Sequence, residues 1–167
     1  MSDLNSSQRS YNMSMIKGKG TKPEMIVRKF LYGNGYRYWL NVKSLPGKPD
    51  IVVKKYGVAI FINGCFWHGH NGCKYFKIPK TRTEWWQTKI ERNITRDAKV
   101  RDELRQKGWR TMVIWECQLK PKLCEQTLKE MAYLLDASYL ERLTKLLRIS
   151  EIGESGQKIG KRNLHSI

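Results

Sequence analysis

The chain has 167 residues, of which 40% are hydrophobic and 28% are charged, as in a soluble protein with one buried core. Lys and Arg number 32 against 15 for Asp and Glu, which gives a formal net charge of +17. This excess attracts polyanions and predicts a nucleic-acid partner. The longest apolar runs, 58–62 and 112–115, are far too short to span a bilayer, which excludes a membrane-spanning protein.

The N-terminal segment 1–11 is polar and lacks the apolar core of a secretion signal. We therefore expect a cytoplasmic protein whose four cysteines are reduced thiols or metal ligands, not disulfides.

Three segments are expected in the first third of the chain. Residues 1–20 form a flexible basic arm that carries Lys17 and Lys19. A helix begins at Thr21, with Glu24 in the position of a capping box, and ends near Gly33 or Gly35. A strand follows at residues 36–41.

The remaining elements predict one mixed α/β (α+β) domain over residues 21–150. A hairpin of strands at 50–54 and 58–62 precedes a long helix at 83–107, a buried strand at 110–115 and one or two closing helices at 123–147. The long helix is expected to bury a stripe in steps of four residues, namely Trp86, Ile90, Ile94 and Ala98. The polar segment 151–167 is expected to be a frayed tail.

Two thiols and two imidazoles lie within nine residues, from Cys65 to Cys73, directly after a predicted buried strand. Cys117 follows another strand, and neighbouring strands bring their ends together. His70 is three residues from Cys73, so we expect Cys65, His70, Cys73 and Cys117 to hold structural Zn²⁺, which favours thiolate and imidazole ligands. The alternative is a set of unrelated buried thiols, and this alternative is favoured for the isolated Cys124.

Asp50, at the start of a strand, is a candidate ligand for Mg²⁺, which prefers oxygen. A metal there could polarise a phosphate and activate water. With His70 assigned to zinc, His68 is left as the general base, because imidazole titrates near neutral pH. Glu24 is a second carboxylate of open purpose. A Pro-Asp pair alone is more often a turn, and the capping box alone explains Glu24.

Aromatic residues occur among cations at two places. Phe66 and Trp67 lie in the Cys/His loop, and Trp86 lies near Lys80, Arg82 and Lys89. Such residues suit insertion between DNA bases, although core packing explains Trp86 equally well. Trp39, Trp109 and Trp115 are assigned to the core.

Together these segments resemble the very short patch repair (Vsr) endonucleases. The resemblance runs from about residue 13 to residue 119, and its main motifs are Leu-Pro-Gly-Lys-Pro-Asp at 45–50, Gly-Cys-Phe-Trp-His at 64–68, Lys-Thr-Arg-Thr-Glu-Trp-Trp at 80–86, Asn93, Arg96-Asp97, Gly-Trp-Arg at 108–110 and Trp-Glu-Cys at 115–117.

The resemblance implies a restriction-endonuclease-like fold, a structural zinc, and Mg²⁺-dependent nicking of DNA beside the thymine of a T:G mismatch, the product of 5-methylcytosine deamination. It implies that Asp50 and the backbone carbonyl of Ile62 bind Mg²⁺, that His68 is catalytic and that Glu24 supports them. Zinc would be bound by Cys65, His70, Cys73 and Cys117. Phe66, Trp67 and Trp86 would enter the DNA stack.

Two features depart from related patterns. The Glu-x-Lys motif of other nucleases is replaced by Ile60, Phe61 and Ile62, an absence that the Vsr family shares. Asn63 stands where family members can carry histidine or aspartate, so this side chain can position water but cannot act as a base.

Two further functions fit the sequence. One is a zinc-stabilised DNA-binding module without catalysis, and the other is a nuclease of the same fold with another DNA target. We expect a monomer, with other repair proteins as further partners.

Overall fold

The computed structural model of the protein describes residues 20–160, together with Gln8 and Tyr11, and the side chains of these residues as far as Arg148. The predicted basic arm, with Lys17 and Lys19, otherwise lies outside the described residues. Within the described part of the chain, no helix is both long and apolar enough to cross a membrane.

The centre of the protein is a four-stranded mixed sheet in the order β1-β2-β3-β4. Strands β1 (Trp39–Leu40), β2 (Ile51–Val53) and β3 (Val58–Asn63) pair antiparallel, as the predicted hairpin requires. Strand β4 (Arg110–Trp115) pairs parallel to β3, from Val58↔Arg110 to Asn63↔Trp115. Because these two strands are parallel, Asn63 and Trp115 end at the same edge of the sheet.

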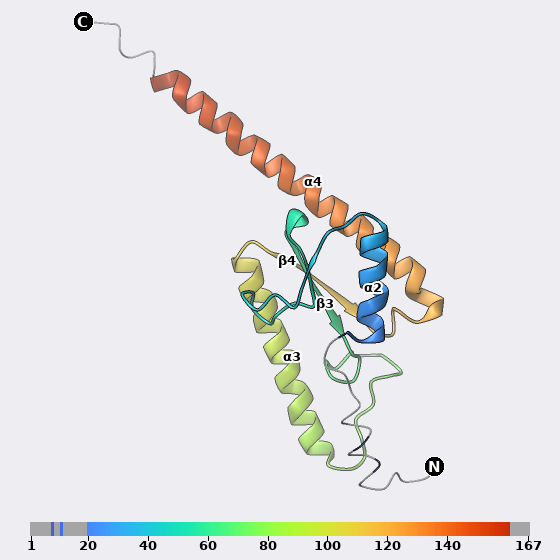
Figure 1. The fold of residues 1–167 in the computed structure, drawn as a ribbon. Coiled ribbons are helices and arrows are strands. Elements are labelled where there is room, and N and C mark those ends of the chain that lie inside the picture. The colour runs from blue at the N-terminus through green and yellow to red at the C-terminus, as the bar shows by residue number, and fades with distance from the viewer. Residues whose placement is uncertain (1–7, 9–10, 12–19, 161–167) are drawn as a thin grey trace, which may run out of the picture.

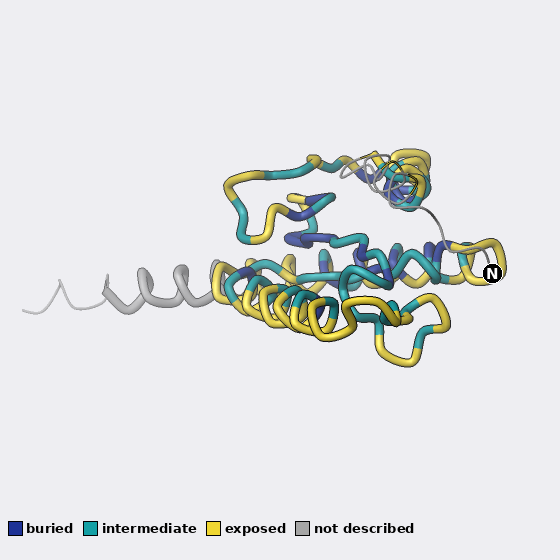
Figure 2. The backbone as a smooth tube through the Cα atoms, turned by 90° about the horizontal axis from the view of Figure 1, so that it is seen from below, coloured by how far each residue is buried: buried dark blue, intermediate teal, exposed yellow. Residues whose placement is uncertain are grey.

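Helices cover the sheet on both sides, and β3 and β4 run between α2 and α3 in Figure 1. Helix α2 (Lys22–Gly33) and helix α4 (Pro121–Gly160) share one hydrophobic core with the sheet, formed by residues such as Val27, Leu31, Ile60, Ile114, Met131 and Leu135. The long helix α3 (Thr83–Gln106) is the crossover between β3 and β4. Figure 2 shows buried residues along the strands and exposed residues along the outer helix surfaces.

The predicted stripe on α3 is wrong in its second half. Ile90 is buried, but Ile94 is 43% exposed and Ala98 is also exposed. Four residues turn a helix by about 400°, so repeated steps of four drift around the axis by about 40° each. The inward face instead mixes steps of three and four and carries Trp86, Ile90, Asn93, Asp97, Val100 and Leu104.

Other predicted elements differ in extent. Only two residues of the predicted strand 36–41 pair, and Trp39, assigned to the core, is 62% exposed on this edge strand. Trp109 is half-buried. The closing helix is one element because no Gly or Pro interrupts the chain between Pro121 and Gly153. It continues to Gly160, so the helix extends into the segment 151–167 that was expected to be a frayed tail, and residues 161–167 lie outside the described part.

Candidate active site and metal centre

The loop that follows β3 distributes its side chains between two neighbouring sites. It turns tightly at Gly69, where φ is +61° and an added Cβ would lie 2.7 Å from Ile94 Cδ1 of α3. The His70 N–H donates to the Cys65 carbonyl at 3.0 Å, and the Asn93 side-chain amide on α3 donates to the Trp67 carbonyl at 2.8 Å. The loop is therefore held in a fixed shape against α3.

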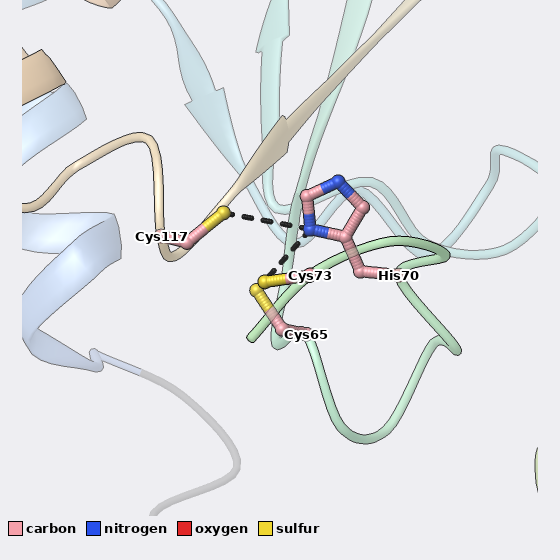
Figure 3. Close-up of side chains that lie close together, drawn as sticks. All are labelled: Cys65, His70, Cys73 and Cys117. Atoms are coloured by element: carbon pink, nitrogen blue, oxygen red, sulfur yellow. Dashed lines mark hydrogen bonds between the residues drawn. The ribbon is translucent and has the colours of Figure 1, made fainter. Parts of the chain in front are cut away.

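Cys65, His70, Cys73 and Cys117 converge at the common end of β3 and β4 (Figure 3). Their four ligand atoms all lie within 4.8 Å of one another, and His70 Nδ1 is 3.4 Å from both Cys65 Sγ and Cys117 Sγ. Ligands in a tetrahedral zinc site with bonds of about 2.0–2.3 Å lie roughly 3.3–3.8 Å apart. The structure thus brings together the predicted set in a geometry that fits a metal ion.

The surroundings of this cluster support it from two sides. The Trp115 ring stacks on the His70 ring, with centroids 4.0 Å apart and planes inclined by 4°, so this tryptophan lies at the cluster and not in the core to which it was assigned. The Glu116 carboxylate accepts a hydrogen bond from the Cys65 N–H at 3.1 Å. Burial raises the pKa of the Cys65 thiol to about 12, so binding of a metal there requires release of a proton.

Cys124 does not join this cluster. It packs, partly buried, against the hydrophobic core, as the sequence predicted.

A second site lies beside the cluster, in a cavity of about 660 Å³. Its walls come from the first turn of α2, the 47–50 turn, the end of β3, the Cys/His loop and the middle of α3. All the residues predicted for catalysis and Mg²⁺ binding line it, namely Glu24, Asp50, Ile62, Asn63 and His68, and so does Trp67 of the predicted DNA-contacting set. Residues far apart in the sequence are thus gathered around one space.

Asp50 lies at the mouth of the β2–β3 hairpin, where its Oδ2 accepts a hydrogen bond from the Ile62 N–H at 2.8 Å. Burial raises the pKa of Asp50. The Ile62 amide and His68 oppose this rise, and the nearby Glu24 carboxylate adds to it. Because burial disfavours the ionised carboxylate of Asp50, a cation bound beside it would stabilise the ionised form.

His68 is paired with Asp97 of α3. Its Nδ1 lies 2.5 Å from Asp97 Oδ2, and the side chains are only 25% and 18% exposed. Burial opposes the ionised form of Asp97, but the hydrogen bonds and charges of His68 and Arg96 outweigh it and lower the pKa of Asp97. An ionised Asp97 makes Nδ1 the protonated nitrogen of a neutral imidazole and leaves Nε2 free to accept a proton.

Glu24 and Asn63 are both buried at the wall of the cavity. Glu24 keeps its predicted capping position, since its two oxygens accept from the Gly20 N–H at 2.9 Å and the Thr21 hydroxyl at 3.0 Å. The Asn63 carbonyl accepts from the Glu116 N–H at 3.0 Å, which joins the ends of β3 and β4.

The predicted aromatic residues form one cluster next to the cavity. Phe66 lies 5.1 Å from both Trp67 and Trp86 between ring centroids. Lys89 Nζ lies 5.5 Å from the centroids of both Trp67 and Trp86, and 4.7 Å from that of Trp85, which is 53% exposed. Lys80 and Arg82 are exposed just before α3. The structure therefore joins aromatic and cationic side chains on one surface.

Sequence reasoning gave no role to three residues that build these sites. They are Asn93, which holds the loop, Asp97, which orients His68, and Glu116, which bonds to Cys65 and lines the cavity. The available signal was position, because Asn93 and Asp97 are four residues apart and so share one face of a predicted helix.

Known proteins resemble this chain over most of its length. The family described as DNA mismatch endonuclease Vsr matches residues 1–74. The type II nicking enzyme V.NmeAIP of Neisseria meningitidis is 47% identical over 133 residues, which are 78% of this chain and 94% of that protein. The DNA mismatch endonuclease Vsr of Escherichia coli is 43% identical over 124 residues, 73% of this chain and 79% of that protein. The type II nicking enzyme V.XorIIP of Xanthomonas oryzae is 44% identical over 116 residues, 70% and 85% of the two chains.

Proposed function

This chain belongs to the Vsr family of DNA mismatch endonucleases, and we propose that it nicks one strand of duplex DNA at T:G mismatches in a Mg²⁺-dependent reaction. The coarser function, DNA-nicking endonuclease, is that of the family and its named relatives. The observation that carries the finer proposal is the cavity in which Asp50 lies with the His68–Asp97 pair.

Asp50 is the proposed ligand for the catalytic cation, together with the Ile62 carbonyl and water. Its Oδ2 is held by the Ile62 amide, and the donor set of oxygen atoms suits Mg²⁺. Bound there, Mg²⁺ would polarise the scissile phosphate and lower the pKa of the attacking water.

His68 is the proposed general base. Because Nδ1 is engaged by Asp97, Nε2 is the atom that would take the proton from the water that attacks phosphorus. Asp97 would hold the ring in this orientation and stabilise the imidazolium that forms. Asn63, with its amide side chain at the cavity wall, would position the water, and Glu24 would hold the first turn of α2 against the site.

Zinc is the proposed occupant of the cluster formed by Cys65, His70, Cys73 and Cys117. Three thiols and one imidazole, closed into a compact set, are typical of a structural zinc site. Its role would be to fix the loop that carries His68 and the aromatic residues.

DNA with a T:G mismatch is the proposed substrate. Phe66, Trp67 and Trp86 would insert into the base stack, where an aromatic side chain replaces lost stacking. Lys89 lies over the rings of Trp67 and Trp86, and Lys80 and Arg82 are close in sequence. The surface thus combines stacking groups with charges for the phosphate backbone. Lys17 and Lys19 would add contacts from the N-terminal arm.

A nicking assay on labelled duplexes tests this function. The zinc-loaded protein should cut the thymine strand of a T:G duplex in the presence of Mg²⁺ and leave the matched T:A duplex intact. Equal cleavage of both duplexes would exclude mismatch specificity. Nicking by Asp50→Asn at the wild-type rate would exclude the proposed site.

A further inference from the structure

The cavity wall contains one half-buried arginine to which no role has been given, Arg101 of α3. Asp97, Val100, Arg101 and Leu104 lie on one side of this helix, at spacings of three and four residues. Val100 packs against the 47–50 turn so closely that a Cβ on Gly47 would lie 2.3 Å from Val100 Cγ1. Gly47, with φ of +64°, therefore lets α3 approach the turn that ends in Asp50, and this contact sets the position of Arg101.

Two neighbouring arginines of α3 pair with carboxylates, whereas Arg101 pairs with none in the part of the chain that the structure describes. Arg96 bonds Asp97 at 3.0 Å, and Arg105 bonds Asp102 at 2.7 Å. Among the described residues, Arg101 has no hydrogen bond or ion pair with a protein group. A half-buried guanidinium in this state keeps its N–H donors available for a ligand.

The charge of the cavity indicates which ligand these donors take. Four carboxylates line it, namely Glu24, Asp50, Asp97 and Glu116, and their negative charge repels the DNA backbone. Lys48, Arg96 and Arg101 are the cations among the lining residues, and Arg96 is already paired. A planar guanidinium matches the oxygens of a phosphate with two parallel hydrogen bonds.

We propose that Arg101 binds a phosphate of the nicked strand inside the cavity and so holds the DNA backbone over Asp50 and His68. This inference rests on the proposed function for the identity of the strand, but it concerns binding and not the cleavage step. Phosphate contacts fix the position of DNA without reading its sequence, so Arg101 contributes equally to T:G and T:A duplexes.

The test is DNA binding without added divalent cations, measured by fluorescence anisotropy over a range of salt concentrations. Arg101→Gln should weaken binding on the order of tenfold at constant salt. The slope of log Kobs against log salt should become less negative by about 0.9. The matched control is Arg105→Gln, which removes the same charge one turn along α3 from a residue outside the cavity wall, and it should leave the slope unchanged.

Arg101→Lys provides a second, milder variant if the glutamine variant does not fold. Lysine keeps the charge but not the planar fork, so the salt slope should return to the wild-type value while affinity stays reduced. Equal slopes for Arg101→Gln and Arg105→Gln would overturn the proposal, as would wild-type affinity in Arg101→Lys. Because binding is measured on both duplexes without cleavage, these results stand even if the protein fails to nick a T:G mismatch.

Discussion

The Cys/His cluster and the proposed catalytic cavity are neighbours built from the same two strand ends, yet their ligand chemistry is opposite. The cluster is a compact set of sulfur and nitrogen ligands within 4.8 Å of one another. The cavity offers carboxylate oxygens around a space of about 660 Å³. Soft, closed ligand sets suit structural zinc, while oxygen ligands with room for water and phosphate suit Mg²⁺.

This comparison shows how one short loop can serve two sites. Cys65, His70 and Cys73 turn to the cluster, and His68, between two of them, turns to the cavity. Glu116 bridges the sites, because its carboxylate accepts from the Cys65 N–H and also lines the cavity. The two regions thus differ in their ligand chemistry but share a loop and the Glu116 hydrogen bond. Each prediction below changes one of the two regions.

The largest effect is expected from Cys117→Ser, which removes the proposed zinc ligand that follows β4. Structural zinc contributes on the order of 10 kcal/mol in small zinc fingers, and a domain with its own core should lose several kcal/mol. Elemental analysis should find zinc lost, and the free energy of unfolding from urea titration should fall. The control is Cys124→Ser, a thiol outside the cluster, which should keep its zinc. A metal-free but equally stable Cys117→Ser protein would contradict a structural role.

Asp50→Asn should lower the nicking rate by roughly 10³-fold or more, since a bound metal supplies several kcal/mol of transition-state stabilisation. Single-turnover nicking of a T:G duplex measures this change. Zinc content and DNA affinity should remain close to wild type, because the cluster and the aromatic surface are untouched. Loss of zinc from this variant would show that the two regions are not separate.

Asp97→Asn should lower the nicking rate by about 10–100-fold, because it removes the group that orients His68. The pKa of Asp97 is lowered in the folded protein, so its ionised form stabilises the fold above the ordinary aspartate pKa, and this stability is lost as pH falls through the lowered value. Thermal melts at neutral and acidic pH should therefore show the variant less stable only in the neutral range. Asp102→Asn, on the exposed side of α3, is the control and should nick normally.

The smallest effect concerns Asp50 and stability. The pKa of Asp50 is raised in the folded protein, so the free energy of unfolding falls as pH rises through that pKa. Without Mg²⁺, the buried ionised carboxylate therefore destabilises the fold at neutral pH. Zinc-loaded Asp50→Asn without Mg²⁺ should therefore melt slightly above the equally treated wild type at neutral pH, with the difference vanishing in acid. A lower melting temperature at neutral pH would mean that the carboxylate stabilises the fold without a cation.

Much of both sites could be predicted because their residues are adjacent in sequence or follow strands that end together. The cluster needed only the spacing from Cys65 to Cys73 and the parallel pairing that brings Cys117 alongside. The partnership of His68 with Asp97 could not be predicted in this way, because it depends on the rotation of α3 about its own axis. A stripe drawn in steps of four placed Ile94 and Ala98 inward and so left Asp97 without a role. The prediction that Trp39 is buried was wrong for a related reason, since burial of an edge strand depends on which helix packs against it.

The separation of the two sites is tested most directly by following nicking and zinc content together during a Mg²⁺ titration of the zinc-loaded protein. We expect nicking of a T:G duplex to begin only when Mg²⁺ is added and to saturate, while about one zinc per chain stays bound throughout. Asp50→Asn should keep the zinc and show no such response. Nicking that proceeds without Mg²⁺, or that rises and falls with zinc content alone, would contradict this account.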